Sequence, residues 1–288
     1  VQTCALPIST SFAIYLDEAS GTTAGGIWTG AANAYPSLSY TAAVPGTGGS
    51  PVHNGLPVVF LRSGGSDGND GATTMTAVKT LSKAVALADL STNPAVYVSV
   101  EDTIPVSGAE SVFGNGTKIV WNGSTGPMFD VEDDDVLIAG GLVIDGNGVS
   151  AVFNVEDGGY LAVRNNTSIS DCVKGINVEG GGELLLNRSI ISAGSYSVYL
   201  DDSTSAFAMF TASDQTITLD KPVYLASGAV IALRSALTSD ITIEYASPAP
   251  NVVVAEGSGD YTPGLDDLDH MYYVDDAWGL DLNEDNQI

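Results

Sequence analysis

The chain has 288 residues, with 35 Asp or Glu against 9 Lys or Arg, so its formal net charge is −26 at pH 7. This charge repels nucleic acids and anionic membrane surfaces and favours cation binding. Hydrophobic residues make up 44% of the chain, too many for a disordered acidic protein, and no apolar run reaches the roughly 18 residues that span a bilayer. We therefore expect a folded protein with a large core, no nucleic-acid partner and no membrane span.

Residues 1–8 resemble a translated sequencing adapter. The codons GTT CAG ACG TGT GCT CTT CCG ATC encode this segment and resemble the end of a widely used adapter. We expect the natural sequence to begin near Ser9; the alternative is an ordinary N-terminal strand. Cys4 then drops out, which leaves Cys172 without a disulfide partner. Because the repeats contain no His to activate it, Cys172 is predicted to be a structural thiol.

Residues 9–57 are rich in Gly, Thr, Ser and Ala, which predicts the end of a preceding β module and a linker. Residues 58–106 predict an N-terminal cap. Strands are expected at 58–61, 95–100 and 103–106, a Gly/Asp loop at 64–71, and an amphipathic helix at 76–90 with Thr76 as its N-cap. Such a cap would cover the apolar interior and unpaired strand edges at the end of a solenoid.

The chain repeats itself from residue 129 onward. Segments 129–133, 153–157, 176–180, 198–202 and 223–227 each begin with an apolar residue, place another two positions later and then turn polar. They start 24, 23, 22 and 25 residues apart (153−129, 176−153, 198−176, 223−198), and two further short strands are expected in each repeat. Three short strands per repeat describe one coil of a parallel β-helix, whose coils stack about 4.8 Å apart. We assign the coils to residues 107–245.

Residues 59–71, followed by 77–84, resemble the opening of right-handed β-helix modules in large bacterial cell-surface proteins of the pectin-lyase-like superfamily. The resemblance covers about residues 58–245. It implies an all-β, right-handed parallel β-helix with an N-terminal capping helix, in an extracellular or cell-surface, adhesin-like protein. The superfamily also includes lyases, hydrolases and phage tailspikes, so the fold alone does not choose a function.

Residues 246–288 break the coil spacing and are predicted to form a closing cap or a junction to another module. A helical turn is expected after Thr262, as N-cap, and Pro263, and a hairpin between 271–274 and 279–282. Residues 281–288 match the first eight positions of an EF-hand loop. However, Asn286 replaces the usual Gly and the closing carboxylate is missing, which favours a hairpin turn.

The expected chemistry is sparse. The resemblance implies two arrangements for an enzyme on this fold: Ca²⁺-binding carboxylates beside an Arg or Lys base in those that cleave acidic polysaccharides, and clustered Asp residues in those that hydrolyse them. Arg164 and Arg234 fall on one exterior ladder about three coils apart, on the order of 14 Å, so they cannot share one sugar-sized centre. Lys174 and Arg188 are weaker candidates for a base, and His53 and His270 lie far apart in the sequence.

The main polar feature is an acidic ladder at one position of four successive repeats, formed by Glu132, Glu156, Glu179 and Asp201. In register these carboxylates would lie about 5 Å apart and repel one another. Raised pKa values, salt screening or bound cations could relieve the repulsion. Ca²⁺ suits clustered oxygen ligands, so these four residues are the candidate calcium ligands; a solvated acidic face is the alternative.

These observations predict a capped β-helix that serves as a rigid stalk or adhesin-like module of a secreted or surface-attached bacterial protein. Its partners would be extracellular glycans, or host or bacterial surface proteins, contacted through polar groups and through Tyr160, Tyr196, Tyr199 and Tyr224. Ordinary β-propensity on an outer face is the alternative explanation of these tyrosines. The alternative functions are a polysaccharide lyase or glycoside hydrolase, and a phage tailspike.

Overall fold

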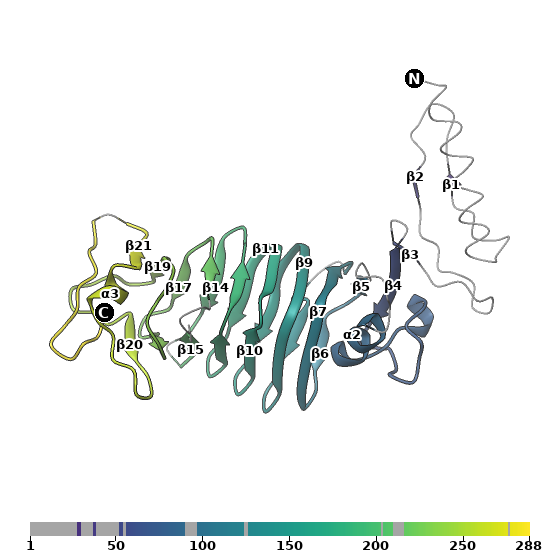
Figure 1. Cartoon of the computed structure of the whole chain (residues 1–288), viewed down its shortest axis with the longest axis horizontal. Helices are drawn as coiled ribbons and strands as arrows, with labels where there is room; N and C mark the ends of the chain where they lie inside the picture. Colours follow the sequence, from purple (N-terminus) through teal and green to yellow (C-terminus); the bar gives the residue numbers. More distant parts are fainter. Residues whose placement is uncertain are drawn as a thin grey trace, which may run out of the picture.

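The computed structural model describes residues 56–89, 97–123, 126–202, 204–209, 216–275 and 277–288, and three short strands before them. Those strands are β1 (Trp28–Thr29), β2 (Ser37–Leu38) and β3 (Val52–His53). Residues 1–8 and most of the predicted preceding module therefore lie outside the described residues. The remainder forms an elongated parallel β-solenoid (Figure 1), which confirms the predicted β-helix.

Three parallel sheets form the walls of the solenoid, and each coil contributes a short stretch to them. The first sheet contains β4 (Leu56–Leu61), β5 (Tyr97–Val100), the end of β7 (Ala109–Trp121), the middle of β9 (Val136–Val155), the start of β11 (Thr167–Val178), β13 (Ser189–Ile191) and β16 (Thr218–Leu219). The second sheet contains β6 (Ile104–Val106), β8 (Phe129–Val131), the ends of β9 and β11, β14 (Tyr196–Leu200), β17 (Val223–Leu225), β19 (Ile241–Tyr245) and β21 (Met271–Tyr273). The third sheet contains the starts of β7 and β9, then β10 (Tyr160–Arg164), β12 (Glu183–Leu186), β15 (Ala206–Met209), β18 (Ile231–Leu233) and β20 (Ala255–Gly257).

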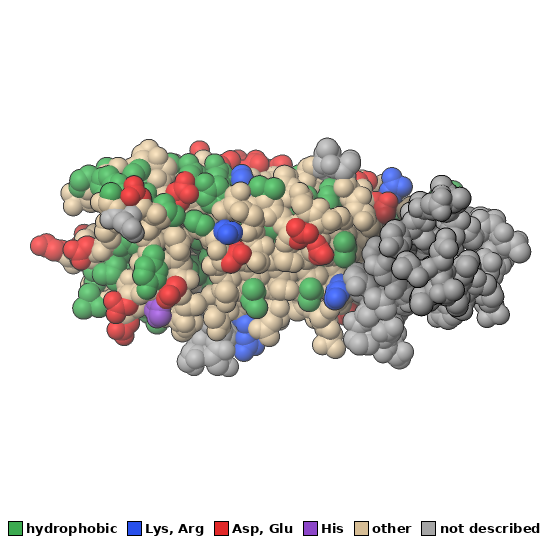
Figure 2. Space-filling view, turned by 90° about the horizontal axis from the view of Figure 1, so that it is seen from above, with side chains coloured by type: hydrophobic (Ala, Val, Ile, Leu, Met, Phe, Trp, Pro, Cys, Tyr) green, Lys and Arg blue, Asp and Glu red, His purple; other side chains and the backbone are tan. Residues whose placement is uncertain are grey.

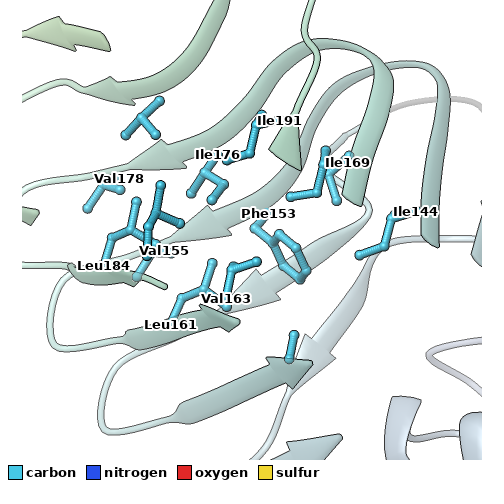
Figure 3. Packing of buried hydrophobic residues seen from close by; sticks show 14 of the residues in the cluster. Ile144, Phe153, Val155, Leu161, Val163, Ile169, Ile176, Val178, Leu184 and Ile191 are labelled. Carbon is cyan, nitrogen blue, oxygen red and sulfur yellow. The ribbon is translucent and has the colours of Figure 1, made fainter. Parts of the chain in front are cut away.

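The core runs along the solenoid axis because alternate residues of each strand point inward. In the second sheet Val131, Val155, Val178 and Leu200 are all 0% exposed and pair in register, which confirms the predicted inner ladder. Figure 3 shows Val155 and Val178 beside residues from the other two sheets. Each such side chain contributes about 1.5–3 kcal/mol when it is fully buried.

The N-terminal end is closed by helix α2 (Leu81–Asp89), so the predicted capping helix is present. Its buried face, formed by Leu81, Ala84, Val85 and Ala88, packs against β4, β5 and β7.

The start of this helix was predicted wrongly. Thr76 ends a 3-10 turn, η1 (Thr74–Thr76), whose N-cap is Thr73. The helix begins five residues later than Thr76 because the Asp67 carboxylate accepts hydrogen bonds from the Lys79 N–H and from the N–H and hydroxyl of Thr80, each at 2.9 Å. These bonds hold the chain at the start of the helix, where the Thr80 hydroxyl accepts from the Lys83 N–H at 3.3 Å.

In the C-terminal region, β20 and β21 continue the third and second sheets. The helical turn is present as α3 (Leu265–Leu268), although Gly264 rather than Thr262 is its N-cap. The predicted hairpin between 271–274 and 279–282 is wrong, because β21 pairs in parallel with β19 and residues 279–282 contain no strand. Residues 281–288 form a turn, in which the Asn283 side-chain oxygen accepts from the Asp285 and Gln287 N–H groups at 2.9 Å.

No helix among the residues described here is long and apolar enough to cross a membrane.

Candidate functional site

The outer face of the second sheet carries the densest row of polar and aromatic side chains. In each strand the residue between two inward-facing residues points outward, and the strand register aligns these residues from coil to coil. We call this row the outer ladder; it consists of Pro105, Asp130, Asn154, Asn177, Tyr199, Tyr224 and Glu244.

The first part of the outer ladder is a chain of side-chain hydrogen bonds across three coils. The Asn177 amide nitrogen donates to the Asn154 side-chain oxygen at 2.8 Å, and the Asn154 amide nitrogen donates to Asp130 Oδ1 at 2.9 Å. Lys174 Nζ donates to Asn177 Oδ1 at 2.8 Å. Stacked amides of this kind bind successive strands along the axis.

The second part of the outer ladder is aromatic. The rings of Tyr199 and Tyr224 stack with centroids 4.4 Å apart and planes 5° apart, and Lys174 Nζ lies 3.6 Å from the Tyr199 centroid. Lys174 comes from the coil before Tyr199 and Tyr224 from the coil after, so both faces of the Tyr199 ring are covered. The tyrosines thus bind coils together, through a cation–π contact worth about 0.5–1 kcal/mol and an aromatic stack.

Tyr196 completes the aromatic part of this face. Its ring lies 5.4 Å from Tyr199 and 5.5 Å from Tyr224, and its hydroxyl donates to Glu244 Oε1 at 3.3 Å. Of the four tyrosines predicted to face outward, three therefore gather in one cluster. Tyr160 does not, because it lies on β10 in the third sheet.

The acidic ladder borders the outer ladder. The N–H groups of Glu156, Glu179 and Asp201 donate to carbonyl oxygens of the preceding coil at 2.9, 2.8 and 3.1 Å, so these residues occupy equivalent places. Glu132 and Asp201 are exposed, whereas Glu156 and Glu179 are half-buried. None of the four is in the core, as predicted from the repeat.

Burial and repulsion raise the pKa values of two ladder residues, Glu156 and Asp201. The pKa of Glu156 is raised, first by desolvation and then by the nearby carboxylates of Asp130, Glu179 and Glu132. The pKa of Asp201 is raised by desolvation and by Glu179 and Asp202, while Lys174 acts in the opposite direction. In the part of the chain that the structure describes, no three His, Cys, Asp or Glu side chains converge on a point that could hold a metal ion. Calcium binding by the ladder stays a prediction.

Lys174 lies where the acidic ladder, the amides and the tyrosines meet. Desolvation lowers the pKa of its half-buried amine, and the carboxylates of Asp201 and Glu179 partly offset this effect. The cluster therefore offers one cationic donor, amide donors and acceptors, and carboxylate acceptors on one face. The amide part was missed from the sequence, although Asp130, Asn154 and Asn177 share the middle position of three successive repeats.

The other residues considered for chemistry lie apart. Arg164 stacks over the Phe113 ring at 5.0 Å, and the strand register places β12 and β15 between its strand and that of Arg234. His270 Nδ1 lies 2.8 Å from Asp240 Oδ1. Cys172 is buried as predicted, and desolvation raises the pKa of its thiol to about 12, which leaves it unreactive. The side chain of His53 lies outside the described residues.

Comparisons with protein-family models, with curated proteins and with solved structures find no match to this chain. The structure shows the fold class, a parallel β-helix. The resemblance to the pectin-lyase-like superfamily and to bacterial cell-surface proteins stays a prediction.

Proposed function

We propose that this chain is a rigid, non-catalytic structural module of a secreted or surface-attached bacterial protein, acting as a stalk or adhesin-like rod. The observation that carries the proposal is the continuous pairing of consecutive coils from β4 to β21 around one hydrophobic core. Between β5 and β20, consecutive coils are joined by backbone pairing in two or three walls, so bending there would break bonds on one side.

Side chains reinforce this axial stiffness. The amides of Asn154 and Asn177 and the stacked rings of Tyr199 and Tyr224 join neighbouring coils outside the core. Inside it, the Phe129 and Phe153 rings stack with centroids 5.3 Å apart. Such a rod needs no disulfide, because stacking alone buries the apolar face of each coil.

The surface supports a role in an extracellular medium. In the face seen in Figure 2, carboxylates are spread along the solenoid with few Lys or Arg side chains between them. A net charge of −26 keeps such rods apart from one another and from anionic surfaces.

A distance measurement between the two ends tests the proposed rigidity. Met75 is 75% exposed near the N-terminal cap, and Asp260 is exposed beyond β20. Spin labels at M75C and D260C, in a C4S background, should give a single narrow distance distribution by pulsed electron paramagnetic resonance. Cys172 can remain, because its buried thiol will not be labelled. Singly labelled chains control for association, and a broad or multi-peaked distribution would contradict the proposal.

Weak glycan binding is a second candidate, supported by the mixed donors and acceptors of Lys174, Asn177 and Glu179 on one face. Since both faces of the Tyr199 ring are covered, recognition would rest on hydrogen bonds rather than ring stacking. Titration with neutral oligosaccharides should show binding that K174A removes, with R234A as the control. With oligosaccharides of uronic acids in place of neutral ones, release of an unsaturated sugar product that K174A abolishes would instead support the lyase alternative.

A further inference from the structure

The C-terminal coil exposes an unusual concentration of apolar side chains. Seven large hydrophobic residues are exposed in the described structure, and three of them, Leu265 at 67%, Tyr272 at 50% and Val274 at 43%, fall within ten residues. The Tyr272 hydroxyl donates to the Asp269 carbonyl at 3.0 Å, which holds β21 beside the end of α3. Val274 follows Glu244 on the outer ladder, because its N–H donates to the Ile243 carbonyl.

Strand β21 pairs along only one of its edges. The His270 carbonyl and the Val274 N–H bond to β19, and residues of a parallel strand bond alternately to the two sides. The N–H and C=O groups of Met271 and Tyr273 therefore point to the other edge, where the described part of the chain provides no strand. Partly buried Leu280 and Leu282 close the end of the core but do not pair with this edge.

The free edges of two other terminal strands, β20 and β4, are occupied. At β20, Ile288 exchanges two backbone hydrogen bonds of 2.9 Å with Ala255. At the N-terminal end, the Phe60 N–H donates to Gly71 and the Phe60 carbonyl accepts from Val78, so the chain itself covers the outer edge of β4. An open strand edge beside exposed apolar side chains is a template for pairing with another chain.

Charge limits what can dock there. Residues 246–288 contain ten Asp or Glu residues and no Lys or Arg. Asp267 is buried and accepts from the Leu237 and Gly264 N–H groups, whereas Asp266, Asp269 and Asp275 are exposed. A second copy that paired its own β21 with this β21 would bring two acidic regions together. A second copy that approached with its N-terminal end would find no free strand edge at β4.

We propose that β21 is a docking edge for an extended segment of another protein in which Lys or Arg residues alternate with apolar residues. The segment would add a strand to the second sheet. Its apolar side chains would point inward beside Met271 and Tyr273 and cover the end of the core. The stems of its basic side chains would lie over Tyr272 and Val274, with their charged ends toward the exposed carboxylates of Asp269 and Asp275. The end of the solenoid would thus bind a basic partner, and this binding does not depend on which ligand the outer ladder binds.

The test uses the full chain and a fluorescent peptide of alternating Val and Lys, with binding followed by fluorescence anisotropy. Saturable binding is expected. A peptide of alternating Val and Glu should not bind, because it meets the same acidic surface. A Val/Lys peptide methylated on alternate backbone nitrogens, which cannot pair with an edge strand, should bind about tenfold more weakly or worse. Equal binding of the methylated peptide would overturn strand addition.

Variants locate the site. The double variant Y272S/V274S should weaken binding of the Val/Lys peptide by about tenfold. The matched control V173S/I190S removes two equally exposed apolar side chains elsewhere on the solenoid and should leave binding unchanged. An equal effect of both variants, whether loss or none, would show that binding is not located at β21 and would overturn the proposal. If analytical ultracentrifugation revealed a dimer that Y272S/V274S disrupts, the edge would bind a second copy, and this result would also overturn the proposal.

Discussion

Asn177 donates its side-chain amide to the side-chain oxygen of Asn154 at 2.8 Å, and this hydrogen bond joins two successive coils on the outer face of the second sheet. Beneath this pair, Val155 and Val178 are in register and fully buried. The same two coils are thus held by a polar contact outside and an apolar contact inside. This arrangement connects the repeat in the sequence to the stiffness of the rod.

The outer contact should stabilise the fold measurably. N154A removes the middle member of the amide chain and leaves the side chains of Asp130 and Asn177 without that partner. We expect a loss of about 1–2 kcal/mol in the free energy of unfolding, measured by urea denaturation. N187A, a half-buried asparagine just after β12, should change the same quantity by less than about 0.5 kcal/mol. Equal losses would show that the amide chain adds nothing.

The buried residue Val178 should contribute more to the free energy of unfolding than an exposed valine on the same strand. V178A removes fully buried methyl groups and should lower the free energy of unfolding by about 1–3 kcal/mol. Val173 also lies on β11 but is 47% exposed, so V173A should cost far less. If urea denaturation gave the two variants the same loss, the assignment of inward and outward positions would be wrong.

Much of this arrangement could be predicted from the sequence, because the repeated segments of the second sheet alternate and a slip of one residue would bury the acidic ladder. The start of α2 could not, since it depends on hydrogen bonds that the Asp67 carboxylate accepts from Lys79 and from Thr80, 13 residues further along the chain. The continuation of the sheets into β20 and β21 was not predicted, because loops of unequal length break the repeat spacing in the sequence. The amide chain was missed because hydrogen bonding between coils depends on register as well as residue type.

The acidic ladder should make stability depend on pH. The pKa of Glu156 is raised above its ordinary value of 4.5 in the folded chain. The folded state therefore binds the proton more tightly than the unfolded state. The resulting stabilisation is complete below the ordinary pKa and is lost as pH rises through the folded value.

E156Q removes this titration and some of the repulsion. The variant should melt at a higher temperature than the natural chain near neutral pH, and the difference should shrink in acid. E183Q, which changes an exposed residue of the third sheet, provides the control. A difference in Tm that grew in acid would mean that Glu156 stabilises the fold as a carboxylate.

Divalent cations should counteract the same repulsion. Millimolar Ca²⁺ is expected to raise the Tm near neutral pH by binding the folded chain preferentially, and E156Q should weaken the response. NaCl at equal ionic strength separates binding from screening. If NaCl reproduced the whole rise in Tm, the ladder would be a solvated acidic face without a specific cation site.

The central claim, that the coils form one continuous stack, is tested most directly by native-state amide hydrogen exchange resolved by residue. The N–H groups of Glu156, Glu179 and Asp201 each donate to the preceding coil, so we predict slow exchange of similar rate at all three. The Met271 and Tyr273 amides, on the open edge of β21, should exchange much faster. A run of fast exchange between Glu156 and Asp201 would reveal a flexible joint and contradict the rigid rod.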